Sequence, residues 1–211
     1  MKTALNLRLY LILDPNLSAR FGLIETLKAA LKEGVTIVQW RAPGMNRSEF
    51  IDKARSIKAV CDTFATPLII DDDVYAAREI NAAGVHIGQR DMPIEKARDI
   101  LGPDFIIGLS VSELAHMNQS RIDLADYLGL GPVFATTSKS DAAPPMGLPV
   151  LSHLAGLSPV PTVAIGGITA QNAPTVISCG VNGVAVISAI CGQDDPAAAT
   201  RLLASRIRPL F

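Results

Sequence analysis

The stretch PLIIDDDV (residues 67–74) carries four uncharged residues and then three consecutive carboxylates. A continuous apolar run that ends in polar residues is typical of a parallel strand buried on both faces. The residues that follow, VYAAREI (74–80), have the pattern of a helix, and Asp73 suits the position of its N-cap. The stretch therefore predicts one strand–turn–helix unit with acidic groups at the turn.

Similar units recur along the whole chain. Apolar runs rich in Val and Ile predict eight strands, at residues 9–14, 36–41, 67–72, 84–88, 105–111, 127–133, 162–167 and 183–188. Segments with helical spacing lie between them, the clearest at residues 22–34, 47–64, 92–102, 169–180 and 195–207. Eight such units predict the α/β class and a single (β/α)8 TIM barrel over residues 1–211. The competing fold is an open doubly wound sheet, but its usual GxGxxG turn is replaced here by PNLSARFG (15–22).

Composition narrows the classes of function. The formal net charge is −1, which argues against a nucleic-acid-binding protein because such a protein needs a basic face for the phosphates. No apolar run reaches the ~18 residues of a membrane span, so we expect no membrane partner. Cys61, Cys179 and Cys191 are scattered without metal-binding spacing, so we expect reduced thiols in a cytoplasmic protein. The sequence leaves the oligomeric state open, a homo-oligomer included.

Polar residues gather where the predicted strands end, and active sites of TIM barrels lie at the carboxyl ends of the strands. The residues that this rule brings to one rim are Gln39, Trp40, Arg41, Asp71, Asp72, Asp91, Ser110, Thr136, Thr137, Ser138, Lys139, Gly167, Ile187 and Ser188. Adjacent carboxylates at Asp71 and Asp72 repel each other, and a cation would remove that cost. Together with Asp91 they suit a Mg²⁺ ion that retains several waters, unless these acids only cap a turn.

Two other groups of residues indicate anion binding. The segments AIGGI (164–168) and AVISAI (185–190) follow strands seven and eight, where barrels often bind phosphate through backbone N–H groups. Glycines that serve only tight turns are the alternative. The hydroxyl groups at 136–138 and Lys139 suit a second anionic group, although a solvated loop has a similar composition. His86 is interpreted as a packed core residue, and Trp40 fits either the core or ligand stacking.

The chain resembles the thiamine phosphate synthase family nearly end to end. The resemblance is carried by QWR (39–41), IIDDDV (69–74), GVHIGQRD (84–91), IIGLSV (106–111), DYLGLGPVFATTSKSDAAP (126–144), VAIGGIT (163–169) and GVAVISAI (183–190). It implies a (β/α)8 barrel and a Mg²⁺-dependent transferase with small-molecule substrates. That enzyme joins hydroxymethylpyrimidine diphosphate to thiazole phosphate, or to its carboxylated form, and releases diphosphate by a dissociative reaction.

The resemblance also implies a role for each site residue. The pyrimidine diphosphate would contact Gln39, Trp40, Arg41, Ala42, Pro43, Asp71, Ser110 and Lys139. Among these, Arg41, Ser110 and Lys139 are implied to be catalytic. Mg²⁺ would be held by Asp72 and Asp91. The thiazole phosphate would contact Thr136, Thr137, Ser138, Gly167, Ile187 and Ser188.

Two positions depart from the family pattern. The family has Gln-x-Arg-x-Lys after strand two, and Pro43 replaces the lysine here. The family usually has asparagine where this chain has Asp71, so an amide that can donate to phosphate becomes an anion. Both changes make the site less positive. We therefore expect weaker diphosphate binding, a greater Mg²⁺ requirement or an altered substrate.

Three other functions stay open at this point. A thiazole tautomerase-like enzyme would lack the metal aspartates and carry a histidine after the strand-six glycine, where this chain has Pro132. A sugar-phosphate isomerase or epimerase needs a general base, for which Asp14 and His86 are the only further candidates. A degenerate paralogue that binds thiazole phosphate or thiamine phosphate without catalysis is the third.

Overall fold

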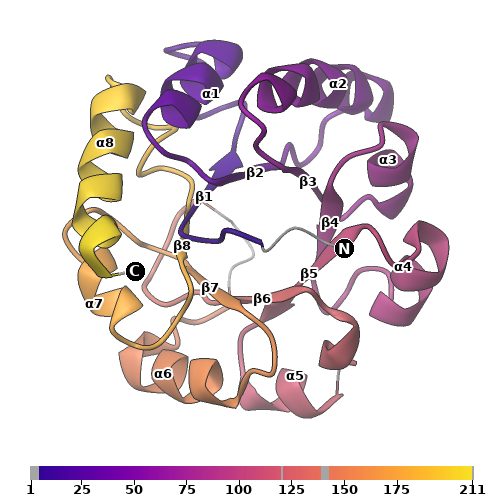
Figure 1. The fold of residues 1–211 in the computed structure, drawn as a ribbon, viewed down its shortest axis with the longest axis vertical. Helices are drawn as coiled ribbons and strands as arrows, with labels where there is room; N and C mark the ends of the chain where they lie inside the picture. Colours follow the sequence, from indigo (N-terminus) through magenta and orange to yellow (C-terminus); the bar gives the residue numbers. More distant parts are fainter. Residues whose placement is uncertain (1–4, 120, 139–142, 211) are drawn as a thin grey trace.

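The strands close into a parallel barrel that is surrounded by helices (Figure 1). The computed structural model describes residues 5–119, 121–138 and 143–210. The strands pair in sequence order, and β1 is hydrogen-bonded to both β2 and β8. The α/β class and the TIM barrel predicted from the sequence are confirmed.

The secondary structure alternates strictly in the described residues. The strands are β1 (Leu9–Leu13), β2 (Ile37–Trp40), β3 (Leu68–Asp71), β4 (Gly84–Ile87), β5 (Ile106–Val111), β6 (Tyr127–Leu130), β7 (Thr162–Ile165) and β8 (Val184–Val186). The helices are α1 (Leu23–Lys32), α2 (Arg47–Thr63), α3 (Val74–Glu79), α4 (Ile94–Leu101), α5 (Leu114–Gln119), α6 (Gly147–Leu157), α7 (Ala173–Ile177) and α8 (Pro196–Ile207). Two short 3-10 helices are η1 (Ile122–Leu124) and η2 (Arg208–Leu210). The strand predicted at 127–133 ends earlier because Pro132 has no N–H to extend the ladder.

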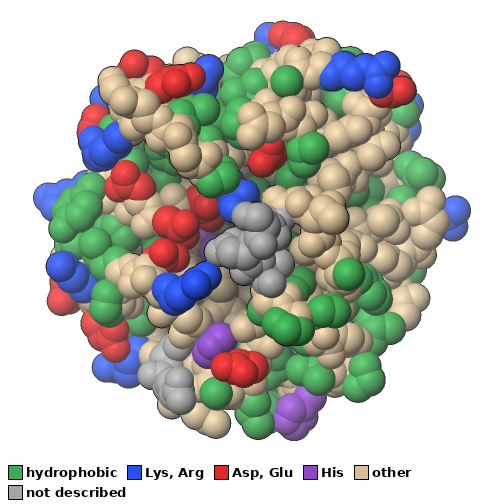
Figure 2. All heavy atoms as spheres, turned by 180° about the vertical axis from the view of Figure 1, so that it is seen from behind, with side chains coloured by type: hydrophobic (Ala, Val, Ile, Leu, Met, Phe, Trp, Pro, Cys, Tyr) green, Lys and Arg blue, Asp and Glu red, His purple; other side chains and the backbone are tan. Residues whose placement is uncertain are grey.

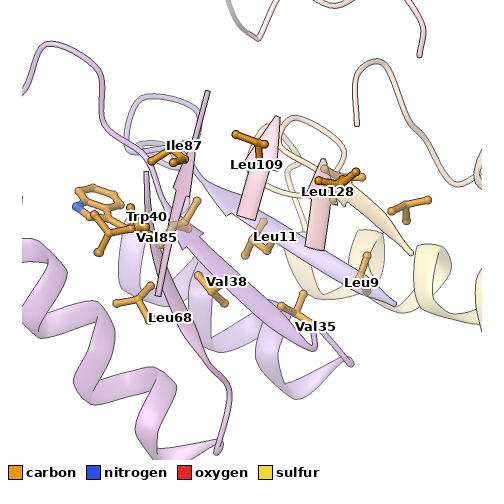
Figure 3. Close-up of a cluster of buried hydrophobic side chains, with 14 of the residues drawn as sticks. Leu9, Leu11, Val35, Val38, Trp40, Leu68, Val85, Ile87, Leu109 and Leu128 are labelled. Carbon is orange, nitrogen blue, oxygen red and sulfur yellow. The ribbon is translucent and has the colours of Figure 1, made fainter. Parts of the chain in front are cut away.

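Successive side chains on each strand point alternately to the helices and to the barrel interior. The outward set forms the larger hydrophobic cluster, part of which is drawn in Figure 3, with Leu9, Leu11, Val38 and Trp40 among its members. The inward set forms a second cluster inside the barrel, which includes Tyr10, Tyr127 and several aliphatic side chains. Both faces of every strand are thus buried, which explains the continuous apolar runs in the sequence.

The first described residues cover the amino-terminal end of the barrel. Leu7 is 2% exposed and packs with the interior cluster, and Figure 1 shows this segment crossing the middle of the ring of strands. A side chain at Gly183 would lie 1.8 Å from the carbonyl oxygen of Leu7, so only glycine allows this approach. The hydrophobic residues of the chain itself therefore close this end of the barrel.

The three cysteines lie among the described residues and form no disulfide, which agrees with the prediction of reduced thiols. Cys61 and Cys191 are free and buried, and Cys179 is free and half-buried. Burial raises the pKa of the Cys61 thiol to about 12, so this thiol stays protonated. None of the helices in the described part of the chain is long and apolar enough to cross a membrane.

Arg98 on α4 forms hydrogen bonds with the two loops that precede β5 and β6. Its Nη1 donates to the carbonyl oxygens of Gly102 at 3.0 Å and Phe105 at 2.7 Å. Its Nη2 donates to the carbonyl oxygen of Leu124 at 2.9 Å and to Asp126 Oδ2 at 2.8 Å. The Arg98 side chain is only 17% exposed, so these charge-assisted bonds stabilise the fold.

We expect Arg98→Met to lower the free energy of unfolding by about 3 kcal/mol. The half-buried Asp126 carboxylate keeps its bond from the Ile107 N–H but loses its counter-charge, and three carbonyl oxygens lose the guanidinium as a donor. Urea denaturation measures this change. The matched control is Arg121→Met, whose ion pair with Asp123 is exposed and whose effect should stay within about 0.5 kcal/mol. Equal effects of the two substitutions would contradict the structural role of Arg98.

Candidate active site

Polar side chains gather at the carboxyl ends of β2 to β5. Gln39 and Asp71 are on strands that pair with each other, and Asp71 is in register with His86 on β4. Ser110 lies near the end of β5. Figure 2 views the molecule from the side opposite to Figure 1 and shows acidic and basic side chains close together near the middle of this face. Gln39, Asp71 and Ser110 therefore lie at one rim of the barrel, as predicted from their positions at the carboxyl ends of the strands.

Arg41 and Asp71 form an ion pair at this end of the barrel. Arg41 Nε lies 3.3 Å from Asp71 Oδ2, and the two side chains are 14% and 18% exposed. Arg41 is held in place by its backbone N–H, which donates to the carbonyl oxygen of Leu13 at the end of β1. The extra carboxylate of this chain is thus aimed at its arginine, and it neutralises part of the positive charge that an anionic ligand would meet.

The three carboxylates of the opening stretch take different positions. Asp73 caps α3, since its Oδ1 accepts from the N–H of Ala76 at 2.8 Å, and the prediction of an N-cap is confirmed. Asp72 is exposed and has a left-handed backbone conformation, with φ of 59°. Its N–H donates to the carbonyl oxygen of His86 at 2.9 Å, which ties the turn to β4. A left-handed aspartate costs backbone energy, and such residues often occur at functional turns.

Asp91 comes from the loop that follows the neighbouring strand β4. One of its oxygens, Oδ2, accepts from the N–H of Gly88 at 2.7 Å, and the residue is exposed. Asp72 and Asp91 offer hard oxygen ligands from two adjacent strand ends, which fits Mg²⁺. Within the described ranges no group of three or more His, Cys, Asp or Glu side chains is placed to hold a metal ion. An ion held by these two carboxylates would take its remaining ligands from water and substrate oxygens.

The loops after β6, β7 and β8 complete the rim. Ser138 N–H donates to Thr136 Oγ1 at 3.2 Å, while Thr137 is exposed. Gly167 has φ of 64°, and a side chain there would lie 2.7 Å from the carbonyl oxygen of Ala135, so this glycine allows close packing of two loops. The predicted residue Lys139 lies outside the described residues.

Backbone N–H groups are available in these loops. No described residue accepts a hydrogen bond from the N–H of Gly167 or of Ser188. Ile187 begins a helical turn, since its carbonyl oxygen accepts from the N–H of Ile190 and of Cys191. N–H groups of this kind are the usual phosphate ligands in barrels.

A chain of hydrogen bonds inside the barrel was missed by the interpretation of the sequence. It runs from Gln39 through Tyr10, Tyr127 and His86 to Ser110. Burial raises the pKa of both tyrosines above the usual range, so both keep their hydrogen. His86 was interpreted as a packed core residue rather than a ligand. It is packed inside the barrel against Gly108 and Gly129, and it is also one link of this polar chain. The sequence carried no clear signal for this chain, because both faces of the strands are largely apolar and the two-residue alternation does not say which face points inward.

The other predicted site residues lie as follows. The Trp40 ring points away from the barrel interior, is fully buried, stacks on Phe50 of α2 and donates from Nε1 to the carbonyl oxygen of Phe50. The Trp40 ring is therefore part of the core and does not stack on a ligand in the barrel mouth. Ala42 is buried and Pro43 is exposed in the turn after β2. Asp14 is buried and accepts from two backbone N–H groups of the next turn, so it serves local structure.

These features define the class: a (β/α)8 barrel with charged, hydroxyl and free N–H groups at the carboxyl ends of its strands, as in barrel enzymes that handle phosphate esters. The chain belongs to the thiamine monophosphate synthase family, whose model matches residues 9–190.

Comparison with individual proteins agrees with this family. The chain is 44% identical to a thiamine-phosphate synthase of Laribacter hongkongensis and 46% identical to one of a Psychrobacter species, in both cases over 96% of each chain. The solved structure of a thiamine phosphate pyrophosphorylase from Pyrococcus furiosus superposes with a TM-score of 0.89 at 35% identity, covering 98% of both chains. A 3-hexulose-6-phosphate synthase, at 17% identity and a TM-score of 0.65, shares the fold alone.

The Arg41–Asp71 pair generates a prediction. We expect Asp71→Asn to tighten binding of inorganic diphosphate in Mg²⁺ buffer by about fivefold, because it removes one negative charge, worth ~1 kcal/mol, from beside the arginine. Isothermal titration calorimetry measures the affinity. The control is Asp104→Asn, an exposed aspartate in the loop before β5, which should change nothing. Unchanged or weaker binding by Asp71→Asn would show that the carboxylate does not compete with the ligand.

Proposed function

We propose that this chain condenses hydroxymethylpyrimidine diphosphate with a thiazole phosphate, giving thiamine phosphate and diphosphate. The observation that carries the proposal is the arrangement at the carboxyl end of β2 to β5. There a cation (Arg41), a hydroxyl (Ser110) and two exposed carboxylates (Asp72 and Asp91) come from adjacent strands. Membership of the family and the named relatives support this assignment.

Each side chain has a task in this reaction. Diphosphate leaves readily only when its developing charge is neutralised, and Arg41 would supply part of that neutralisation. Lys139 would add a second cation according to the family resemblance. Asp72 and Asp91 would hold Mg²⁺, which when bound supplies further charge neutralisation for the leaving group. The residues near the arginine are thus assigned to the pyrimidine diphosphate.

The second substrate is assigned to the opposite side of the rim. The hydroxyl groups of Thr136 to Ser138 and the N–H groups of Gly167 and Ser188 would bind the thiazole phosphate. Departure of diphosphate leaves positive charge on the pyrimidine, and the ring nitrogen of the thiazole attacks the exocyclic carbon. This step needs no protein nucleophile, so positioning of the two substrates supplies much of the catalysis.

The site residues support the three alternative functions, an isomerase or epimerase, a tautomerase-like enzyme and a non-catalytic binding protein, less well than the synthase. Both candidate general bases of an isomerase have local partners: Asp14 accepts from two backbone N–H groups, and His86 is bonded through both ring nitrogens. The tautomerase-like alternative lacks its histidine because Pro132 occupies that position. A protein that only binds thiazole phosphate would form no product in a two-substrate assay.

The proposal is tested by steady-state kinetics with both substrates and Mg²⁺. We expect Asp72→Asn and Asp91→Asn each to raise the Mg²⁺ concentration for half-maximal activity by roughly tenfold, equivalent to ~1.4 kcal/mol. Asparagine is chosen because it tolerates the left-handed backbone of Asp72.

The matched control for these variants is Asp73→Asn, which removes a neighbouring charge and keeps an N-cap. Its Mg²⁺ requirement should stay close to that of the unmodified protein. A folded protein that forms no thiamine phosphate at saturating substrates would refute the proposed function. An unchanged Mg²⁺ requirement in the Asp72 and Asp91 variants would refute the metal assignment alone.

A further inference from the structure

The polar chain inside the barrel joins five strands. Tyr10 on β1 accepts from Gln39 Nε2 on β2 at 3.0 Å, and Tyr10 Oη lies 2.8 Å from Tyr127 Oη on β6. Tyr127 Oη lies 2.9 Å from His86 Nδ1 on β4, and His86 Nε2 lies 2.9 Å from Ser110 Oγ on β5. The chain therefore connects two side chains of the proposed substrate site, Gln39 and Ser110, through three residues with no assigned role.

Two glycines make the space for the histidine. Gly108 on β5 is in register with both His86 and Tyr127, which lie on the strands to either side. A Cβ atom at Gly108 would lie 2.2 Å from the Tyr127 ring and 2.4 Å from His86 Nδ1. A Cβ atom at Gly129 would lie 3.0 Å from the His86 ring. The barrel interior is thus shaped around the His86–Tyr127 contact.

The hydrogen-bonding inventory sets the direction of the chain. Tyr10 is 1% exposed, and in the described residues its hydroxyl bonds only to Gln39 and Tyr127. Because Gln39 Nε2 donates to Tyr10, the hydrogen of Tyr10 must go to Tyr127, or a buried donor would be left without an acceptor. The hydrogen of Tyr127, which bonds to Tyr10 and His86, then goes to His86 Nδ1.

With the Gln39 amide in this orientation, the same inventory determines which ring nitrogen of His86 carries the hydrogen. A neutral imidazole that accepts at Nδ1 carries its hydrogen on Nε2, and it donates this hydrogen to Ser110 Oγ. Ser110 then keeps its own hydroxyl hydrogen for another acceptor. With the Gln39 amide turned round, every donor in the chain would reverse and Ser110 would give its hydrogen to His86 instead. When the hydrogen bonds run from Gln39 towards Ser110, the Ser110 hydroxyl can donate to a ligand. When they run in the opposite direction, its hydrogen is used by His86.

We propose that His86 is a positioning residue, locked by Tyr127 as the Nε2–H tautomer so that the Ser110 hydroxyl donates its hydrogen to the substrate at the mouth of the barrel. The same order leaves Gln39 Oε1 as an acceptor. An aminopyrimidine complements this pair, because it offers an amino donor and a ring-nitrogen acceptor. The inference uses the proposed function only for the identity of the substrate, and the tautomer itself is a property of the free protein.

The tautomer is measured first, without ligand. Long-range ¹H–¹⁵N spectra of the ¹⁵N-histidine-labelled full chain at neutral pH distinguish a protonated ring nitrogen from an unprotonated one. Variants His116→Gln and His153→Gln identify the signals of His86. We expect an unprotonated Nδ1 and a protonated Nε2. The Nδ1–H tautomer, or a mixture of the two, would overturn the inference whatever the enzyme catalyses.

Kinetics with both substrates then test the consequence. Tyr127→Phe removes the donor to Nδ1, so we expect kcat/KM for the pyrimidine diphosphate to fall about tenfold while KM for the thiazole phosphate stays unchanged. The control is Tyr75→Phe, an exposed tyrosine on α3 that should stay within about twofold of the unmodified protein. Equal values for the two variants would contradict the role of the chain.

A pair of substitutions at the histidine separates positioning from packing. The amide nitrogen of glutamine reaches the place of Nε2, whereas that of asparagine reaches only the place of Nδ1. We therefore expect His86→Gln to keep a donor to Ser110 and to lose about threefold in kcat/KM, and His86→Asn to lose about tenfold. Equal losses would mean that the ring serves only to fill the barrel, and the inference would fail.

Discussion

The structure depends on one constraint: eight parallel strands close on themselves, so every second side chain must be accommodated inside the ring. The outward residues pack against helices and can be uniformly apolar. The inward residues face other strands, and any polar atom among them must find its partner there. Tyr10, Tyr127 and His86 satisfy this requirement by bonding to one another in a line. The interior of the barrel is therefore both a packed core and a connected polar path that ends at the rim.

The common direction of the strands places all carboxyl ends on one side, and this decides where charge can gather. Three successive acids at the end of β3 would be costly in a single environment. They are separated because Asp71 points to Arg41, Asp73 points to the first turn of α3, and Asp72 is turned outward by its left-handed backbone. The three carboxylates thus lie in different environments, and of these three only Asp72 is exposed. Asp91, in the loop after β4, is exposed as well.

This distribution of charge bears on the two departures from the family pattern. Pro43 is exposed and carries no charge, and the Asp71 carboxylate neutralises part of the positive charge of Arg41. The proposed diphosphate site therefore has less fixed positive charge than the family pattern implies. Under the proposed function, a Mg²⁺ ion held by Asp72 and Asp91 would supply positive charge in its place. The phosphate of the second substrate would depend instead on backbone N–H groups.

Much of the architecture could be predicted from the sequence, because runs such as GVHIG and TVAIGG require burial on both faces and occur eight times. The N-cap at Asp73 was also predictable from its place before a helical run. The orientation of Trp40 was not, because with both faces apolar the pattern does not say which residues point inward. The Arg41–Asp71 pair and the chain through His86 join residues that are 24 to 117 positions apart. Only the register of the closed barrel brings them together.

The most direct test of the central claim is calorimetry of inorganic diphosphate binding to the unmodified protein, with and without saturating Mg²⁺. Because the fixed charge of the site is low, the affinity should rise at least about tenfold when Mg²⁺ is present. The same affinity in both conditions would contradict the claim that Asp72 and Asp91 hold a metal that binds the leaving group.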